Sequence, residues 1–195
     1  MNLPNKLTVS RLVLTVFFLV ALLAPFPAHE TLALALFVAA SVTDYYDGAL
    51  ARRHRLITNF GILMDPLADK ILICSAFIAF VGLGWLPAWM AIVIVARELA
   101  ITGLRLLAAA KNLVLAAERF GKHKTISQIV CIVAVLTSVA YPTWGGLGRV
   151  LFGWPAGSPW VGGVAEVSKW AAVALTLLSG SVYLWRNREL YLQDV

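Results

Sequence analysis

The sequence predicts an all-α integral membrane protein with six transmembrane helices, preceded by a short N-terminal interfacial helix. Hydrophobic residues occupy 61% of the 195 positions, charged residues only 13%, and the mean hydropathy is +0.83. This composition excludes an ordinary soluble domain or a disordered chain. Six apolar stretches are separated by loops that alternate between basic and non-basic. Because there is no internal repeat, low-complexity tail or linker, we expect residues 1–195 to form one domain.

The six predicted spans follow from their length, since a helix needs about 20 mostly apolar residues to cross a bilayer. The polar lead-in at 2–11 predicts the interfacial helix, and Pro25 and Pro27 end the first span. These prolines stand where a signal peptide would have small residues, which argues against cleavage. The predicted spans are 12–24, 31–51, 62–82, 88–110, 126–141 and 164–185.

The charges predict the orientation. The chain has 16 Lys and Arg against 10 Asp and Glu, a net charge of +6. The loops after the first, third and fifth predicted spans hold one basic residue, Arg149. The two terminal segments and the loops after the second and fourth spans hold the following basic residues: Lys6, Arg11, Arg52, Arg53, Arg55, Lys111, Arg119, Lys122, Lys124, Arg186 and Arg188. By the positive-inside rule, both termini are cytoplasmic and the protein is a multi-pass protein of the cell (inner) membrane. The excess charge therefore indicates topology and an anionic membrane or substrate, with no nucleic acid partner.

The segment 141–163 contains seven of the fourteen glycines, three prolines and three tryptophans. Tryptophan favours the membrane interface, so we predict an aromatic hairpin there, with a binding role as the alternative. Cys74 and Cys131 lie in apolar runs and are expected to be packing residues without a disulfide or a metal. His54 and His123 are expected at the surface.

Four acidic residues lie within one window of 26 positions, as two pairs on consecutive predicted spans. Asp44 and Asp47 are three apart, and Asp65 and Asp69 are four apart, so each pair shares a helix face. The basic loop between the spans puts both pairs at the cytoplasmic side. Converging carboxylates need shared protons or a cation, and oxygen ligands favour Mg²⁺, Mn²⁺ or Ca²⁺. The alternative is a set of salt bridges from the aspartates to Arg52, Arg53 and Lys70.

Small residues border the aspartates. Gly48 follows Asp47, and Gly61 lies one turn before Asp65. Glycine inside a helix costs about 1 kcal/mol relative to alanine, so its presence indicates close approach of another group. Ala51 keeps the same face open, and Arg52 borders it. Such a cavity suits a diphosphate, whose oxygens bind metal ions and arginine.

The eight identities in Asp44-x-x-Asp47-Gly48-x-x-Ala51-Arg52, eight residues, and Gly61-x-x-x-Asp65-x-x-x-Asp69 resemble the complete motif of the CDP-alcohol phosphatidyltransferases. The resemblance implies a six-helix membrane enzyme, usually a homodimer, with two divalent metal ions, Mg²⁺ or Mn²⁺. Such enzymes transfer a substituted phosphoryl group from a CDP-alcohol to the hydroxyl of a second alcohol and release CMP.

By position, the resemblance makes the four aspartates metal ligands and Asp69 the catalytic base that takes the proton of the attacking hydroxyl. It also implies which residues contact the CDP-alcohol, namely Asp44, Gly48, Ala51, Arg52, Thr58 and Gly61.

Two further stretches, MNLPNKLTVSR and RELAITGLRLLAAAKNLVLAAERFGKHKT, resemble the branch of this family formed by the bacterial phosphatidylglycerophosphate synthases. That branch would use CDP-diacylglycerol and sn-glycerol 3-phosphate. The predicted pocket for the acceptor phosphate consists of Arg97, Arg105, Lys122 and Lys124. Arg97 and Arg105 are eight residues apart, about 80° around the helix axis, so they are expected on one broad side of their helix. Two alternatives remain: Glu98 and Arg105, seven residues apart, could form a structural network, and the lysines could simply mark the cytoplasmic side.

Other functions fit less of the sequence. A cardiolipin synthase of the same family would use phosphatidylglycerol as acceptor and would have less need for deep cations; inositol-phosphate and serine acceptors are further alternatives. A divalent-cation transporter would bind its ion near the bilayer midplane between repeats or broken helices. Here the acids lie at one membrane face beside arginines, and no duplicated half is visible.

Overall fold

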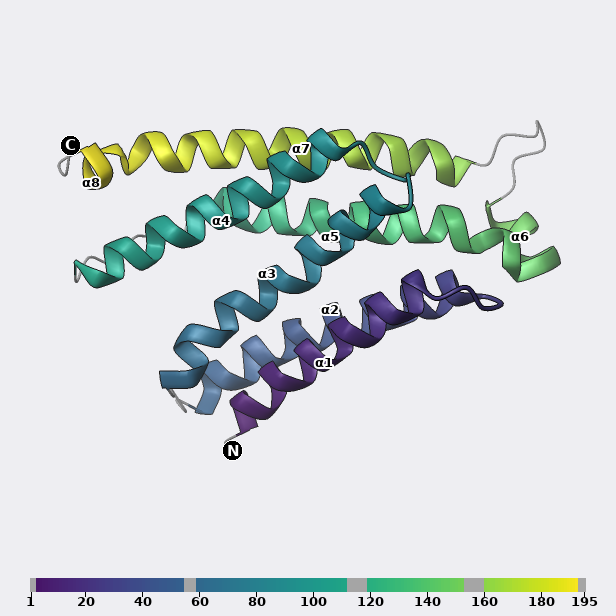
Figure 1. Cartoon of the computed structure of the whole chain (residues 1–195), viewed down its shortest axis with the longest axis horizontal. Coiled ribbons are helices and arrows are strands. Elements are labelled where there is room, and N and C mark those ends of the chain that lie inside the picture. The colour runs from purple at the N-terminus through teal and green to yellow at the C-terminus, as the bar shows by residue number, and fades with distance from the viewer. Residues whose placement is uncertain (1–2, 55–58, 112–118, 153–159, 193–195) are drawn as a thin grey trace.

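The computed structural model describes residues 3–54, 59–111, 119–152 and 160–192, and every regular element in these ranges is a helix. Six helices are long and three are short (Figure 1). The long helices are α1 (Leu3–Leu23), α2 (His29–His54), α3 (Asn59–Gly82), α4 (Ala88–Ala110), α5 (Arg119–Ala140) and α7 (Trp160–Arg186). The short ones are the 3₁₀ helix η1 (Tyr141–Trp144), α6 (Gly145–Phe152) and α8 (Arg188–Leu192).

The long helices form an elongated bundle with two distinct ends. One end, which we call the aspartate end, holds the start of α1, the end of α2, the start of α3 and the C-terminal α8 (Figure 1). The opposite end holds the α1–α2 turn, the α3–α4 turn and α6. Helix α1 packs on α2 and α3, while α7 packs on α4 and α5. Helix α1 therefore begins at the end of the bundle where α8 lies (Figure 1).

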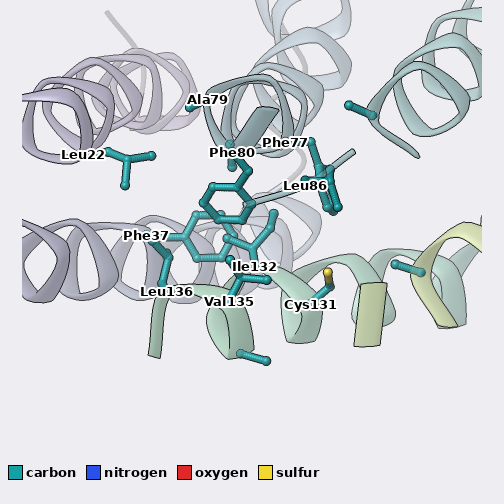
Figure 2. Close-up of a cluster of buried hydrophobic side chains, with 14 of the residues drawn as sticks. Leu22, Phe37, Phe77, Ala79, Phe80, Leu86, Cys131, Ile132, Val135 and Leu136 are labelled. Atoms are coloured by element: carbon teal, nitrogen blue, oxygen red, sulfur yellow. The ribbon is translucent and has the colours of Figure 1, made fainter. Parts of the chain in front are cut away.

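A cluster of buried apolar side chains fills the half of the bundle away from the aspartate end (Figure 2). Phe18 of α1 and Phe37 of α2 lie with ring centroids 5.6 Å apart, and Phe77 meets Phe80 of α3 edge-on at 6.4 Å. Ile132 brings α5 into the same cluster. The cluster therefore ties four helices together.

The outward faces of the helices are apolar. Large side chains such as Phe17, Ile92, Leu99, Leu178 and Trp185 are exposed, in a pattern that suits lipid better than water. Within the described residues, two helical segments meet the length and hydropathy of a membrane span, His123–Trp144 and Trp160–Arg186. Three shorter apolar segments accompany them: Val9–Leu23, His29–Thr43 and Lys70–Gly82.

The helices correct two predictions. The interfacial lead-in is not a separate element, because it continues into the first span as one helix, α1; Pro4 lies in its first turn, where a missing N–H costs nothing. The predicted hairpin at 141–163 begins instead as two short helices, η1 and α6. Here Gly148 permits a close approach, since a Cβ at this position would lie 2.2 Å from the carbonyl oxygen of Tyr141.

The aromatic character of this segment is as predicted. Phe152 contacts the rings of Tyr141, Trp144 and Trp160 at centroid distances of 5.6 to 6.2 Å. The indole N–H of Trp144 donates to Thr31 Oγ1 at 2.8 Å, which ties the segment to the start of α2. These contacts account for the tryptophans as packing residues, although Trp154 lies outside the described part of the chain.

Candidate functional site

The motif aspartates lie on two consecutive helices at the aspartate end. Asp44 and Asp47 belong to the C-terminal half of α2, and Asp65 and Asp69 to the N-terminal half of α3. Both helices pack on α1. Only four residues separate His54 from Asn59, so these helix ends lie within about 18 Å of one another. The aspartate side chains lie outside the described side chains.

The motif's small and basic residues share these two helices. Gly48, Ala51 and Arg52 lie on α2 and Gly61 lies on α3, so both helices extend beyond the predicted spans, which end at residue 51 and begin at residue 62. Thr58 lies outside the described residues, and so does the side chain of Arg52. The backbone therefore supports the helical periodicity on which the motif was interpreted, and the ligand roles remain predictions.

The described side chains form a second polar group, centred on Glu98 in the middle of α4. Its carboxylate is 1% exposed. Lys70 of α3 donates to Oε2, and Lys124 of α5 donates to Oε1. The guanidinium of Arg97 and the amide of Gln128 also approach Oε1, each at 3.4 Å. We call Lys70, Arg97, Glu98, Lys124 and Gln128 the Glu98 cluster.

Helix α7 completes this cluster from the other side. Gln128 Nε2 donates to Thr176 Oγ1 at 3.1 Å, and Arg97 Nη2 donates to Ser179 Oγ at 3.3 Å. The side chains of Thr176 and Ser179 are buried. Four helices thus supply polar groups to one site inside a bundle whose outer faces are apolar.

Arg105 lies apart from the Glu98 cluster. Its Nε donates to the hydroxyl of Tyr183 at 3.3 Å, and its guanidinium carbon lies 5.6 Å from the centre of the same ring. Arg97 and Arg105 both turn toward α7, in agreement with their predicted common side of α4. The predicted alternative of a Glu98–Arg105 network is wrong, because seven residues separate the two by about 10 Å along the axis and Glu98 finds its partners on α3 and α5.

Of the predicted phosphate-binding residues, the structure brings together Arg97 and Lys124, and puts Arg105 on the same face of α4. Lys122 belongs to the first turns of α5, but its side chain lies outside the described side chains. His123 is exposed, as predicted, and the side chain of His54 is outside the described set.

Sequence reasoning missed Lys70 and Gln128 as members of this site. Lys70 was considered only as a salt-bridge partner of the aspartates, whereas its described partner is Glu98. The sequence does indicate that both residues need a polar partner, since a lysine or a glutamine inside an apolar helix is costly without one. The identity of that partner, 28 residues away for Lys70 and 30 for Gln128, was not available.

A cavity of about 100 Å³ is lined by both polar and apolar side chains. Lys70 lines it together with Arg11, Ser41 and Thr125. Lys70 directly follows Asp69, and Ser41 lies one turn before Asp44. The cavity therefore borders both the aspartate helices and the Glu98 cluster.

Among the described residues, no three His, Cys, Asp or Glu side chains lie close enough to hold an ion. Cys74 and Cys131 are free thiols, and Cys131 belongs to the apolar cluster, in agreement with their predicted packing role.

Comparison with known proteins defines the class. The family model for CDP-alcohol phosphatidyltransferase matches residues 1–178 of the chain. The chain belongs to the CDP-alcohol phosphatidyltransferase family and is therefore an enzyme of phospholipid synthesis. Together with the apolar helices, this identifies a membrane protein.

The names of individual relatives specify one reaction within this family. A protein of Bacillus subtilis (strain 168) named CDP-diacylglycerol–glycerol-3-phosphate 3-phosphatidyltransferase is 40% identical, over 96% of each chain. One of the same name from Rickettsia felis is 31% identical, over 93% of each chain. A probable phosphatidylglycerophosphate synthase of Mycobacterium tuberculosis (strain H37Rv) is 45% identical over 67% of this chain and 64% of its own length.

Proposed function

We propose that this chain is a phosphatidylglycerophosphate synthase, which transfers the phosphatidyl group from CDP-diacylglycerol to sn-glycerol 3-phosphate and releases CMP. One observation carries the choice of acceptor: the Glu98 cluster holds three cations and one carboxylate, beside a cavity that adjoins the aspartate helices. An acceptor without a phosphate would leave this excess charge without a counterpart. The names of full-length relatives support the same acceptor.

The aspartates are proposed to hold two Mg²⁺ or Mn²⁺ ions, with Asp44, Asp47, Asp65 and Asp69 as ligands. The donor set fits, because it consists of carboxylates alone, which suit hard divalent ions, and it comes from two helix segments joined by four residues. When bound, the ions supply charge neutralisation for the diphosphate and for the departing CMP.

The nucleotide is proposed to lie against α2 and α3. Gly48, Ala51 and Gly61 present no side chain larger than a methyl group, so the CDP group can approach the helix backbone. Arg52 can donate paired hydrogen bonds to phosphate oxygens. Thr58 and Asp44 complete the proposed contacts.

Asp69 is proposed as the general base. Its carboxylate accepts the proton of the attacking glycerol hydroxyl as that oxygen forms a bond to the phosphatidyl phosphorus. The bond from the same phosphorus to the bridging oxygen breaks, and CMP leaves with the electron pair. The proton then passes from Asp69 to water, which restores the base.

The acceptor phosphate is proposed to bind Arg97, Arg105, Lys122 and Lys124, with Lys70 as a further donor. Lys70 and Lys124 each have three N–H groups, and their described contacts with Glu98 use one of them. Lys70 is partly exposed, so its remaining donors can reach phosphate oxygens, whereas those of buried Lys124 require the phosphate to enter the cluster. Arg105, held by Tyr183, is about two turns from Arg97 along α4. It is proposed to bind the acceptor phosphate from outside the Glu98 cluster.

The membrane arrangement is also part of the proposal. Residues 1–195 form a single domain with six spans in the cell membrane, and the aspartate end, with both termini, faces the cytoplasm, where CDP-activated lipids and soluble glycerol 3-phosphate meet. The basic loops support this orientation. We expect a homodimer surrounded by membrane lipids, as the family resemblance implies.

An acceptor panel tests the function. The purified chain in micelles of CDP-diacylglycerol is given glycerol 3-phosphate, phosphatidylglycerol, inositol phosphate or serine, and CMP release is followed. We expect release with glycerol 3-phosphate and a product that carries two phosphates. Release with phosphatidylglycerol alone would instead identify a cardiolipin synthase.

A further inference from the structure

The carboxylate of Glu98 connects three cations from three different helices. Lys70 comes from α3, Arg97 from α4 itself and Lys124 from α5. Both carboxylate oxygens are used: Oε2 by Lys70, and Oε1 by Lys124, Arg97 and Gln128.

The geometry requires Glu98 because the cations would otherwise repel one another. Lys124 is 2% exposed and Glu98 1%, so water screens them poorly and each charge needs a close partner. A single carboxylate satisfies three neighbours at once. It neutralises only one of them, and the cluster keeps a net charge of +2.

A net charge of +2 matches one class of ligand. A phosphomonoester carries close to two negative charges at neutral pH, so it would balance the cluster. A phosphodiester carries one charge and a neutral alcohol none, and each would leave buried positive charge uncompensated. The cluster thus discriminates by charge as well as by shape.

Lys70 is the cation that links the Glu98 cluster to the cavity at the aspartate helices. Its side chain is 31% exposed and lines the cavity at the aspartate helices, and Lys70 directly follows Asp69 in the sequence. The ammonium of Lys70 is bound to Glu98 Oε2 while its side chain lines the cavity, so Glu98 sets where this cation lies at the cavity wall. Lys124 donates to the other carboxylate oxygen, Oε1, and is held inside the cluster.

We infer that Glu98 is a positioning and specificity-determining residue, which fixes Lys70 and Lys124 so that the site accepts a phosphomonoester acceptor in preference to a phosphodiester or an uncharged alcohol. Glu98 acts through its cations and does not touch the substrate. This inference rests on the proposed function and adds the residue that organises its acceptor pocket.

The test compares Glu98→Gln and Glu98→Asp with the wild-type chain, in micelles with each substrate varied in turn. Glutamine turns one acceptor oxygen into an N–H donor, which would face a lysine. We expect the KM for glycerol 3-phosphate to rise by about tenfold or more, and the KM for CDP-diacylglycerol to stay within about twofold. The preference for glycerol 3-phosphate over glycerol should fall in parallel.

The Glu98→Asp variant distinguishes the effect of the carboxylate's position from the effect of its charge. Aspartate keeps the charge but is one methylene shorter, so it cannot reach both lysines, and we expect a defect in the same parameter. The matched control is Glu166→Gln on α7, since Glu166 is exposed and its partner Lys169 lies one turn away on the same helix. This control should keep both KM values.

Three results would overturn the inference: an unchanged KM for glycerol 3-phosphate in Glu98→Gln, equal changes in both KM values, or a wild-type KM in Glu98→Asp. If Glu98→Gln fails to fold, Lys70→Gln carries the test, since it removes one contact from a partly exposed side chain and should again affect glycerol 3-phosphate alone. Wild-type turnover of glycerol 3-phosphate in the same assay separates these failures from a wrong acceptor assignment, in which the wild-type chain itself would be inactive.

Discussion

Arg97 of α4 lies directly over Gly180 of α7, where a Cβ built on the glycine would be 2.9 Å from Arg97 Cγ. This is closer than carbon atoms approach without displacement. The absence of a side chain at Gly180 therefore lets the stem of Arg97 cross α7, and its guanidinium reaches Ser179 and Glu98.

Gly180→Ala should displace Arg97 and weaken acceptor binding without unfolding the protein. Alanine is favoured over glycine in a helix by about 1 kcal/mol, so thermal stability should hold or rise. We expect kcat/KM for glycerol 3-phosphate to fall about fivefold, a loss of about 1 kcal/mol. The control is Gly163→Ala on the same helix, where nothing lies within 4 Å of the added Cβ. Equal kinetics in the two variants would show that Arg97 tolerates the methyl group.

Asp69→Asn should separate binding from chemistry. Asparagine can still offer one oxygen to a metal ion but cannot accept the hydroxyl proton. We expect turnover to fall by about 10²- to 10⁴-fold, while metal binding in the presence of CDP is retained. Calorimetric titration and single-turnover assays would measure the two properties, and an active Asp69→Asn enzyme would exclude this residue as the base.

Arg105 and Tyr183 can be tested as a pair. Arg105→Ala should raise the KM for glycerol 3-phosphate far more than that for CDP-diacylglycerol. Tyr183→Phe keeps the ring beneath the guanidinium but removes the hydroxyl acceptor, so it should cost only about 1 kcal/mol, or about fivefold in the same KM. Equal losses for both substrates in Arg105→Ala would mean that Arg105 has a structural role.

Removal of divalent ions should abolish activity reversibly. With carboxylates as the only proposed ligands, EDTA should stop CMP release, and Mg²⁺ or Mn²⁺ should restore it. Asp47→Asn should raise the metal concentration needed for half-maximal rate. Full activity after exhaustive chelation would contradict the metal proposal.

The apolar cluster should govern stability and not acceptor choice. Phe80 is completely buried, whereas Ile78 on the same helix is 58% exposed. Phe80→Ala should destabilise the fold by about 3–5 kcal/mol through the cavity that it leaves. Ile78→Ala should change stability little, because lipid chains can fill the space. Thermal unfolding in detergent would compare them; a similar loss for both would argue against the packing in Figure 2.

The sequence predicted the structure best for properties that depend on one helix alone, such as its bounds and the side on which a residue lies. Helix α4 begins and ends where the hydropathy predicts, at Ala88 and Ala110, and the spacing of Arg97 and Arg105 correctly predicted a common side. The error at the N-terminus has a local cause: the polar lead-in continues the helical pattern of α1, and polarity alone does not end a helix.

The sequence by itself determined the class of protein. Its apolar composition requires helices that satisfy their own backbone groups in lipid, and the motif of eight identities over residues 44–69 indicates the family whose model matches the chain. The tertiary structure alone decided which charges meet. Glu98 lies 28 residues after Lys70 and 26 before Lys124, and helical periodicity gives each a direction on its own helix but no partner on another. Packing of α3, α4 and α5 sets that choice, because a buried cation must find the nearest carboxylate when water is absent.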